Sequence, residues 1–295
     1  MTDTIVKPGC LYVVATPMGN LADITYRAVE VLGGVEIIAC EDTRHSRRLL
    51  SRYQISAELV SYHEHNEQLS ASRIMSQLAE DKSVALITDA GTPGISDPGY
   101  RLTRLAAEQG VTVVPVPGAS SLTAALSVAG LPTDSFYFSG FLPQKQKAAQ
   151  DVLSSLKDMK STLVFFSPAR KLINVLEMAA ATLGNRQASV CREMTKIYEE
   201  VVRGSLAELA DTFAARGQEI KGEVVLVIEG RPAGESTLDA TELEPKLGEL
   251  LEKIQDADGM GARKLTALAA EKLGERRNRL YPLVCAWLNE RQNDQ

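Results

Sequence analysis

The sequence has few aromatic residues and few cysteines. Phe, Trp and Tyr make up 5% of its 295 residues, and the four cysteines include no CxxC pair; they are Cys10, Cys40, Cys191 and Cys285. A disulfide framework or a zinc knuckle needs cysteines that are numerous or closely spaced. We therefore expect free, buried thiols and no bound metal.

Long apolar runs are also missing. None approaches the roughly 20 residues that cross a bilayer, and the initial stretch MTDTIVKPG has no apolar core of the secretion-signal type. We expect a cytoplasmic protein without a membrane partner. Positive charge is in deficit, because 32 Lys and Arg face 38 Asp and Glu for a net charge of -6. That balance argues against a protein that coats nucleic acid without specificity.

Several common catalytic motifs do not occur. Without GxxxxGK[ST], or a GxGxxG after the first expected strand, a kinase, an NTPase or a dinucleotide dehydrogenase is disfavoured. There is no GxSxG elbow, and all three histidines fall between His45 and His65, which disfavours a serine hydrolase. His63 and His65 have the spacing of metal ligands, but no cysteine is near them. A solvated surface loop is the better interpretation of that pair.

Short β-branched runs alternate with helical patterns from Leu11 to about Leu131. This alternation predicts a mostly parallel sheet with crossover helices, and the most apolar runs predict strands buried on both faces. We expect an N-terminal α/β domain over residues 1–131. Its strands are expected at LYVVA from Leu11, VEIIAC from Val35, ELVSY from Glu58, VALIT from Val84 and VTVVPV from Val111.

A second βα series predicts another α/β domain over residues 132–234. Its expected strands are YFSGF, TLVFF, ASVCRE, YEEVVRG and EVVLVIEG. Between Glu235 and Asp258, eight acids face two lysines, which predicts a solvated linker and an acidic helix. A helical spacing follows from Met260 and stops at Gly274, and a last helix is expected to be interrupted near Pro282. We assign residues 235–295 to this linker and a small helical domain.

Four loops follow strands of the first domain. Each alone is explained by turns and helix caps. The carboxyl ends of parallel strands share one edge, however, and glycine-rich backbone at that edge can approach a ligand closely. Together the loops predict a small-molecule pocket. They are ATPMGNLADIT (15–25), EDTRHSRR (41–48), DAGTPGISDPG (89–99) and PGASS (117–121).

Basic residues gather in two places despite the negative net charge. A solvated helix face is the default interpretation of each cluster, but the separation of these clusters from the acidic linker favours a polyanionic partner. Arginine binds phosphate oxygens in a planar, bidentate manner. The first cluster is Arg44, Arg47, Arg48 and Arg52, and the second is Arg263, Lys264, Lys272, Arg276, Arg277 and Arg279.

The loops also carry a family resemblance. In order, ATPMGNLADIT, ACEDTR, DAGTPGISDPG, PGASS, FSGFLP, FFSPAR, CREMTKIYEE and KGEVVLVIEG resemble the tetrapyrrole methylase superfamily of S-adenosylmethionine (SAM) enzymes, and more closely its ribosomal branch. The likeness runs from about Gly9 to Gly230. Because the superfamily's commoner first loop, GxGPGDPxLLT, is replaced here, a porphyrin-type substrate is disfavoured.

The resemblance implies a fold and an activity. The fold would be a two-domain, tetrapyrrole-methylase-like α/β structure with SAM in the cleft between the domains, and the protein would be a homodimer. The activity would be 2'-O-methylation of a cytidine ribose in 16S rRNA of the small ribosomal subunit. A tetrapyrrole C-methyltransferase of the uroporphyrinogen or precorrin type remains an alternative. A noncatalytic RNA-binding assembly factor is another.

The resemblance implies site residues as well. A ribose hydroxyl needs a base or an electrostatic device before it attacks a methyl group, and the charged candidates in the matched motifs are Glu41, Arg44 and Lys196, beside Arg192, Glu193 and Glu200. The sequence does not single out a base. RNA would be held by Arg44, Arg47, Arg48, Arg52, Arg276, Arg277 and Arg279. SAM would be held by Thr16, Pro17, Met18, Gly19, Asp89, Ala90, Gly91, Thr92, Ile95, Asp97, Gly118, Ala119, Ser120, Ser121, Phe141, Leu142, Phe166, Gly222, Glu223 and Val224.

Overall fold

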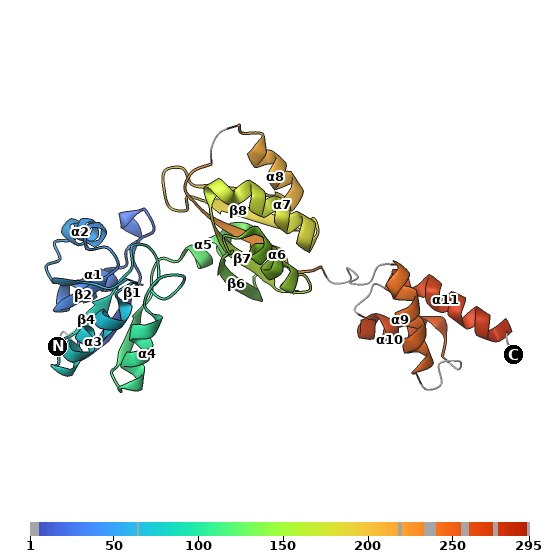
Figure 1. The fold of residues 1–295 in the computed structure, drawn as a ribbon, viewed down its shortest axis with the longest axis horizontal. Coiled ribbons are helices and arrows are strands. Elements are labelled where there is room, and N and C mark those ends of the chain that lie inside the picture. Colours follow the sequence, from blue (N-terminus) through green and yellow to red (C-terminus); the bar gives the residue numbers. More distant parts are fainter. Residues whose placement is uncertain are drawn as a thin grey trace.

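The computed structural model describes residues 6–63, 65–217, 220–232, 240–254, 260–273 and 277–293. Figure 1 shows two α/β units, one at the N-terminal end and one in the middle, followed by a group of helices at the C-terminal end. This is the α/β fold that the sequence predicts, with the expected helices after it.

The first sheet contains five parallel strands in the order β3-β2-β4-β1-β5. Its central strands are almost completely buried because helices cover both faces, which explains their unbroken apolar sequences. The strands are β1 (Leu11–Val14), β2 (Ile37–Cys40), β3 (Glu58–Ser61), β4 (Val84–Leu86) and β5 (Val113–Val116).

Side-chain caps start the elements that follow β1 and β2. Asn20, Thr25 and Asp42 each accept a hydrogen bond from a backbone N–H at the start of a helix. The two faces of the sheet form separate apolar cores, one under α1 and one under α3 and α4. The helical segments are η1 (Leu21–Asp23), α1 (Tyr26–Gly34), α2 (Thr43–Arg52), α3 (Glu67–Ala79) and α4 (Tyr100–Glu108).

The second sheet is mixed, with the order β6-β7-β10-β8-β9. Strand β10 runs antiparallel to both β7 and β8, so its first residues lie beside the last residues of those strands. The strands are β6 (Phe136–Phe141), β7 (Thr162–Pro168), β8 (Gln187–Arg192), β9 (Glu200–Ser205) and β10 (Glu223–Ile228). The helical segments are α6 (Gln146–Ser155), η2 (Ala169–Lys171), α7 (Leu172–Leu183) and α8 (Leu206–Ala214).

Helix α5 (Ser121–Ala129) connects the two units. Its residues Ala125, Leu126 and Ala129 are buried against β7, β8 and β10, in a core shared with Val164 and Cys191. The expected domain boundary at residue 131 therefore falls after a helix that packs on the second sheet. The start of α5 still faces the loops of the first sheet, so this helix fixes the position of one unit against the other (Figure 1).

The C-terminal helices form a core of their own. They are α9 (Ala240–Glu252), α10 (Ala262–Leu273) and α11 (Arg277–Asn293). Buried leucines such as Leu243, Leu251 and Leu265 pack together in this core. The expected break near Pro282 was wrong, because α11 continues through that residue. Leu280 and Val284, on either side of the proline, are buried in the same core, and this packing holds the helix across the missing hydrogen bond.

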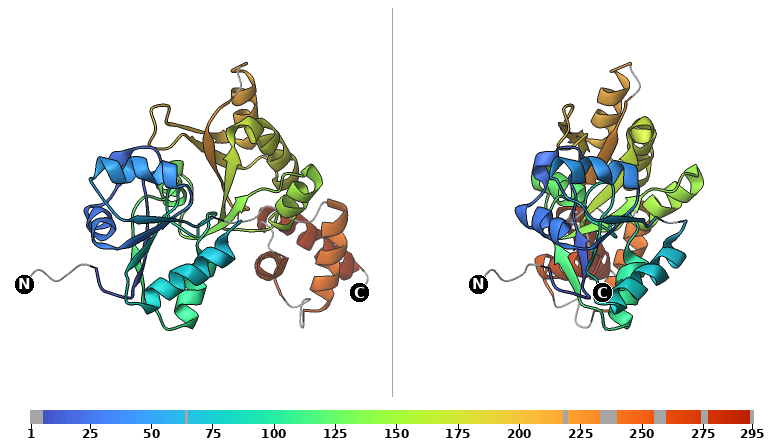
Figure 2. Two further views of the ribbon diagram at one scale, coloured as in Figure 1. Left: turned by 60° about the vertical axis from the view of Figure 1, so that its left-hand side comes forward. Right: turned by 90° about the vertical axis from the view of Figure 1, so that its left-hand side faces the viewer.

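The described thiols are free, and Cys10, Cys40 and Cys191 are buried while Cys285 is half-buried. No helix within the described ranges has the length and apolar character needed to span a membrane. Figure 2 turns the molecule to show that the carboxyl edge of the first sheet faces the second unit. The two α/β units therefore meet at the loops that the sequence singles out.

Candidate active site

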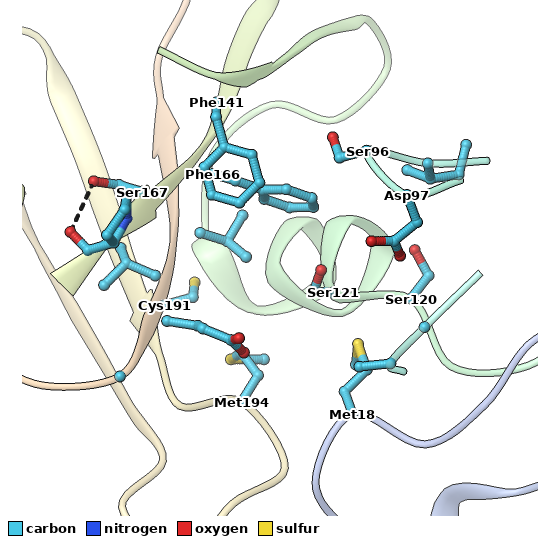
Figure 3. A pocket seen from close by; sticks show the side chains of 18 of the residues that line it. Met18, Ser96, Asp97, Ser120, Ser121, Phe141, Phe166, Ser167, Cys191 and Met194 are labelled. Carbon is cyan, nitrogen blue, oxygen red and sulfur yellow. Dashed lines mark hydrogen bonds between the residues drawn. The ribbon is translucent and has the colours of Figure 1, made fainter. Parts of the chain in front are cut away.

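A cavity of about 540 Å³ lies between the two α/β units. The first unit contributes the loops after β1, β2 and β4 and the start of α5. The second contributes the ends of β6, β7 and β8 and the beginning of β10. In the close view of Figure 3, Phe141 and Phe166 lie on one side of the cavity, and Ser96 and Asp97 lie on the other. The site is therefore built jointly by both units.

Backbone bonds hold the loops of the first unit together. Thr16 and Gly91 form an isolated β-bridge, with Thr16 N donating to Gly91 O over 2.8 Å and Gly91 N donating to Thr16 O over 2.9 Å. The buried Thr16 hydroxyl donates to Thr88 O, and the Thr92 hydroxyl donates to Ala119 O. The loops after β1, β4 and β5 therefore form one connected rim.

The second unit supplies an aromatic wall and a tight backbone turn. The ring centroids of Phe141 and Phe166 are 5.4 Å apart in an edge-to-face arrangement. Gly222 has a φ of +99°, and a Cβ there would lie 2.4 Å from the Glu193 carboxyl. Only glycine fits that position without displacing Glu193.

Carboxyl groups line the side that the first unit contributes. Burial, together with the neighbouring Glu41 carboxylate, raises the pKa of Asp97 to about 6. Burial also raises the pKa of Glu41, and the charge of Asp89 adds to that effect. Asp89 Oδ1 accepts a hydrogen bond from Asp42 N over 3.2 Å, which ties the loop after β4 to the start of α2. The pocket therefore gathers negative charge, which suits a cationic ligand.

Lys196 crosses from the second unit to the first. Its Nζ lies 2.9 Å from Glu193 Oε1 and 3.1 Å from Glu223 Oε2. Burial opposes its charge, but hydrogen bonds to these two carboxylates raise the pKa of Lys196 overall. Its carbon chain packs on Gly19, where a Cβ would come within 2.5 Å of the Lys196 Cγ. The charge of Lys196 is therefore paired within the second unit, while its carbon chain contacts the first, and the residue cannot accept a proton near neutral pH.

Most residues that the resemblance implies for SAM line this cavity. They come from the loops after β1 and β4, from the start of α5 and from the facing strand ends of the second unit. The lining residues from the expected set are Met18, Asp89, Ala90, Gly91, Thr92, Ile95, Asp97, Ser120, Ser121, Phe141, Phe166, Gly222, Glu223 and Val224.

The other residues of the expected set lie behind or beside the cavity. Thr16 and Ala119 act through the hydrogen bonds of the rim, and Pro17 is buried. Leu142 faces a neighbouring hollow. The two remaining residues are glycines, and each allows a neighbour to pack closely. Gly19 lies against Lys196, and Gly118 lies against the backbone and Cβ of Ala15. These six residues therefore support the site and do not line it.

Several lining residues escaped the sequence interpretation. Ser167, Pro168 and Arg170 come from the FFSPAR string, while Cys191 and Met194 come from CREMTKIYEE. Both strings carry the family resemblance, so the signal was present, but only Phe166 and the charged residues of the second string were taken from them. Ser96 and Val225 complete the additional lining.

The charged candidates separate clearly in space. Glu41 and Lys196 line the cavity, and Arg44 lies exposed on α2 outside the lining. Arg192 and Glu200 form an ion pair in the second unit, which indicates a structural role for both.

The surface-loop interpretation of the histidine pair holds for the exposed His65 but was wrong for His63. His63 is half-buried, and its buried Nδ1 has no hydrogen-bond partner among the described residues.

The expected RNA-binding arginines lie on two separate surfaces. Arg44, Arg47, Arg48 and Arg52 are exposed on α2, directly after the Glu41 that lines the cavity. Within the described part of the chain, none of these four forms an ion pair. Arg277 and Arg279 are exposed on α11, whereas Arg276 lies outside the described residues.

The family model for Tetrapyrrole (Corrin/Porphyrin) Methylases matches residues 10–210. The chain belongs to this family of SAM-dependent methyltransferases. The match covers the first α/β unit and most of the second, and so includes loops from both sides of the cavity.

Curated relatives show which members of the family this chain resembles. The protein named "Ribosomal RNA small subunit methyltransferase I" from Haemophilus influenzae is 41% identical over 96% of this chain and 98% of its own. Its namesake from Escherichia coli O157:H7 is 43% identical over 92% of this chain and 93% of its own. A third, from Halalkalibacterium halodurans, is 46% identical over 75% of this chain and 76% of its own. The first two relatives match the C-terminal helices as well as the α/β units.

Solved structures agree on the fold. A cobalt precorrin-4 methyltransferase superposes with a TM-score of 0.56 over 75% of this chain and 95% of its own, at 19% identity. A uroporphyrin-III-C-methyltransferase from Thermus thermophilus gives 0.54 over 75% and 94%, at 21% identity. At that identity the likeness concerns the fold alone.

The residues of the cavity fit SAM. SAM carries an adenine ring and a positively charged sulfonium, and the cavity offers an apolar aromatic wall opposite a cluster of carboxyl groups. The glycine turns at Gly91 and Gly222 bring backbone to the surface of the cavity without side chains in the way. A volume of about 540 Å³ falls in the ordinary range for small-molecule sites.

Proposed function

We propose that this protein transfers a methyl group from SAM to the 2'-oxygen of a cytidine ribose in 16S rRNA of the small ribosomal subunit. The observation that carries the proposal is a cation-suited cavity between the two α/β units in a chain that is 41–46% identical to three proteins named Ribosomal RNA small subunit methyltransferase I. The residues expected to hold SAM come from both sides of that cavity.

SAM supplies the methyl group: the ribose 2'-oxygen bonds to the methyl carbon as the carbon–sulfur bond breaks, the electron pair goes to sulfur, and the hydroxyl proton leaves to a base. Because attack must be in line, the main task of the protein is to orient both reactants. The connected rim of Thr16, Gly91 and Ala119 and the opposing Phe141 and Phe166 hold the site rigid for this purpose.

Glu41 is the proposed proton acceptor. Of the three charged candidates, Arg44 lies outside the lining and Lys196 is held protonated by Glu193 and Glu223. Glu41 lines the cavity, and its pKa is raised by burial, which makes a carboxylate a better base.

Positive charge beside the cavity is proposed to hold the RNA. Arg44, Arg47, Arg48 and Arg52 are exposed on α2, which begins two residues after Glu41, and none of them forms a salt bridge with a described residue. Unpaired arginines are available to phosphate oxygens. The arginines at 276, 277 and 279 are proposed as a second contact.

Two alternatives are less well supported. A tetrapyrrole C-methyltransferase shares the fold, but the structures named for those substrates are only 18–21% identical to this chain. A noncatalytic RNA-binding assembly factor would not need the cavity that the two units build between them. A calorimetric titration with SAM separates this factor from an enzyme, because the factor would give no heat of binding.

We also propose that the protein is a homodimer and works in the cytoplasm. The edge strand β6 exposes Phe136 and Tyr137, with Phe136 45% exposed. Apolar groups gathered on one sheet edge are typical of subunit contacts. Light scattering of the purified chain is expected to give twice the chain mass of 32.0 kDa.

The test of the activity uses small ribosomal subunits from a strain that lacks the enzyme. Purified protein and SAM with a labelled methyl group should place label on one cytidine ribose, and mass spectrometry of nuclease fragments locates it. Glu41→Gln is expected to retain SAM binding and to lower kcat about 100-fold, because it removes the proposed proton acceptor. Label on a base, or on a uroporphyrinogen tested in parallel, would contradict the proposal.

A further inference from the structure

A second hollow of about 450 Å³ lies beside the SAM cavity, between α6 and α7. Phe166, Ser167 and Pro168 at the end of β7 line both spaces, so one strand end separates them. Apart from Leu142 and the three shared residues Phe166, Ser167 and Pro168, the residues of this hollow have no part in the proposed binding of SAM. It is therefore a distinct space that shares a wall with the reaction site.

The hollow has an apolar floor and an amide rim. Leu142, Val175 and Met178 supply apolar surface, and the amides of Gln144, Gln146, Gln150 and Asn174 surround it. Within the described ranges these four amides make no side-chain hydrogen bond. An amide offers donors and an acceptor together, as does the edge of a nucleobase, and the flat face of a base suits an apolar floor.

Two consecutive basic residues follow the strand end that separates the two spaces. Arg170 lines the SAM cavity and Lys171 lines the second hollow, and they are consecutive residues of η2. Neither forms an ion pair with a described residue. The methylated nucleotide must reach the SAM cavity and is joined to its neighbour by one phosphate, so a neighbouring base bound in the hollow would place that phosphate near these cations.

The hollow also contains a carboxylate, which limits what it can bind. Glu177 is the acidic residue among the lining residues that the structure describes. A carboxylate repels a terminal phosphate but accepts a hydrogen bond from the exocyclic amine of a base such as cytosine. The balance of groups favours a base in the hollow and a phosphate at the wall.

We propose that this hollow binds the base of a nucleotide adjacent to the methylated one in the rRNA. The proposal rests on the proposed function and adds a flanking-base site to it. Gln150 on α6 and Asn174 on α7 reach the hollow from opposite helices, so together they set the position of the base. With the flanking base held, the target ribose is fixed relative to the SAM cavity.

The test compares the parent chain with the double variant Gln150→Ala and Asn174→Ala. Both positions are exposed, so the fold should survive the change. The KM for unmethylated small subunits is expected to rise about tenfold, since two base contacts are lost, while kcat and SAM affinity stay unchanged. Gln109→Ala, which removes an exposed amide at the end of α4, is the matched control and should behave like the parent.

A second measurement identifies the contact itself. A short oligoribonucleotide around the methylated residue is made with each flanking base removed in turn. Removal of the base at one flanking position should weaken binding to the parent about tenfold. The same removal should have little further effect on the double variant, because that variant has already lost the contact with this base.

The outcomes distinguish the proposals. Normal methylation by the parent with equal KM for both chains would overturn this inference alone. Weaker SAM binding by the double variant would assign the hollow to the cofactor, and a changed oligomeric state would assign it to a second copy; either result overturns the inference. A parent that places no methyl group on rRNA would overturn the proposed function and this inference with it.

Discussion

Asp97 is the ionisable residue whose environment most directly predicts pH dependence. Its pKa is raised to about 6 by burial and by Glu41, and it lines the SAM cavity. An acid whose pKa is raised on folding adds most to stability below the ordinary carboxyl value and loses that contribution as the pH rises through about 6. At neutral pH, therefore, the ionised Asp97 lowers the stability of the folded protein.

Replacing Asp97 by Asn should stabilise the protein in a pH-dependent way. Because asparagine does not titrate, Asp97→Asn is expected to raise the free energy of unfolding by about 1 kcal/mol at pH 8 and to give no gain near pH 4. Thermal unfolding of both chains across this range measures the difference. A constant difference at all pH values would contradict the assigned cause.

The same residue should couple SAM affinity to pH. Ionised Asp97 attracts the cationic ligand, so the parent is expected to bind SAM about fivefold more weakly at pH 5 than at pH 7.5. Asp97→Asn should bind weakly at both values. Calorimetry at the two pH values gives the comparison, and Asp134→Asn, an exposed acid outside the cavity, should follow the parent.

A substitution at Gly222 tests whether the Glu193–Lys196 pair shapes the SAM cavity. Both Gly222 and Gly184 have positive φ, at +99° and +88°, so an alanine costs about 1 kcal/mol at either position. Only at Gly222 would the new Cβ also displace Glu193, since nothing lies within 4 Å of a Cβ at Gly184. Gly222→Ala should therefore lose SAM affinity about tenfold or more in calorimetry, while Gly184→Ala keeps it.

At the scale of elements, the exposed positive charge of α2 predicts that this helix binds RNA. Arg47→Ala with Arg48→Ala removes two exposed arginines that have no acidic partner among the described residues. RNA binding is expected to weaken, and the slope of log affinity against log salt should fall by about 1.5, because two phosphate contacts are lost. SAM affinity should not change.

The control for α2 uses arginines that are already paired. Arg73 binds Glu58 at 3.3 Å, and Arg104 binds Glu108 at 2.7 Å. Arg73→Ala with Arg104→Ala changes the net charge by the same amount and should leave the salt slope unaltered. Equal effects of the two double variants would show that net charge, and not α2, governs binding.

At the scale of the whole molecule, the C-terminal helices have a core separate from the site. Leu247, Leu265 and Leu280 pack among α9, α10 and α11, and among the described residues none of the SAM cavity lining comes from these helices. A chain ending at residue 232 is expected to bind SAM with unchanged affinity and to have a higher KM for ribosomal particles. Loss of SAM binding on truncation would show that the helices support the cavity.

The secondary structure of the α/β units could be predicted from local sequence. Each of the ten expected strands overlaps a strand of the structure, because apolar β-branched runs must be buried and the turns between them are rich in Gly and Pro. Pro282 shows the limit of local rules. Its effect on α11 depends on the burial of Leu280 and Val284, which the sequence does not reveal.

Site positions could be predicted less completely than strands. The loops that carry Glu41, Asp89 and Asp97 were found because they follow parallel strands that end at one edge, and the family resemblance singled out these residues within them. Cys191 and Met194 were missed, since β8 belongs to the other sheet and only the meeting of the units brings it to the cavity. His63 was misjudged because its spacing from His65 does not reveal its burial.

The amino-acid sequence by itself determined the strands, the loops at the edge of the first sheet and the family, because these depend on local chemistry and on long, unusual strings of residues. The tertiary structure alone decided which charges meet. Antiparallel pairing of β10 with β7 and β8 places Glu223 beside Lys196, and the packing of α5 on the second sheet sets the two walls of the cavity opposite each other. Such contacts join residues far apart in the chain, and their geometry follows from the packing of whole elements.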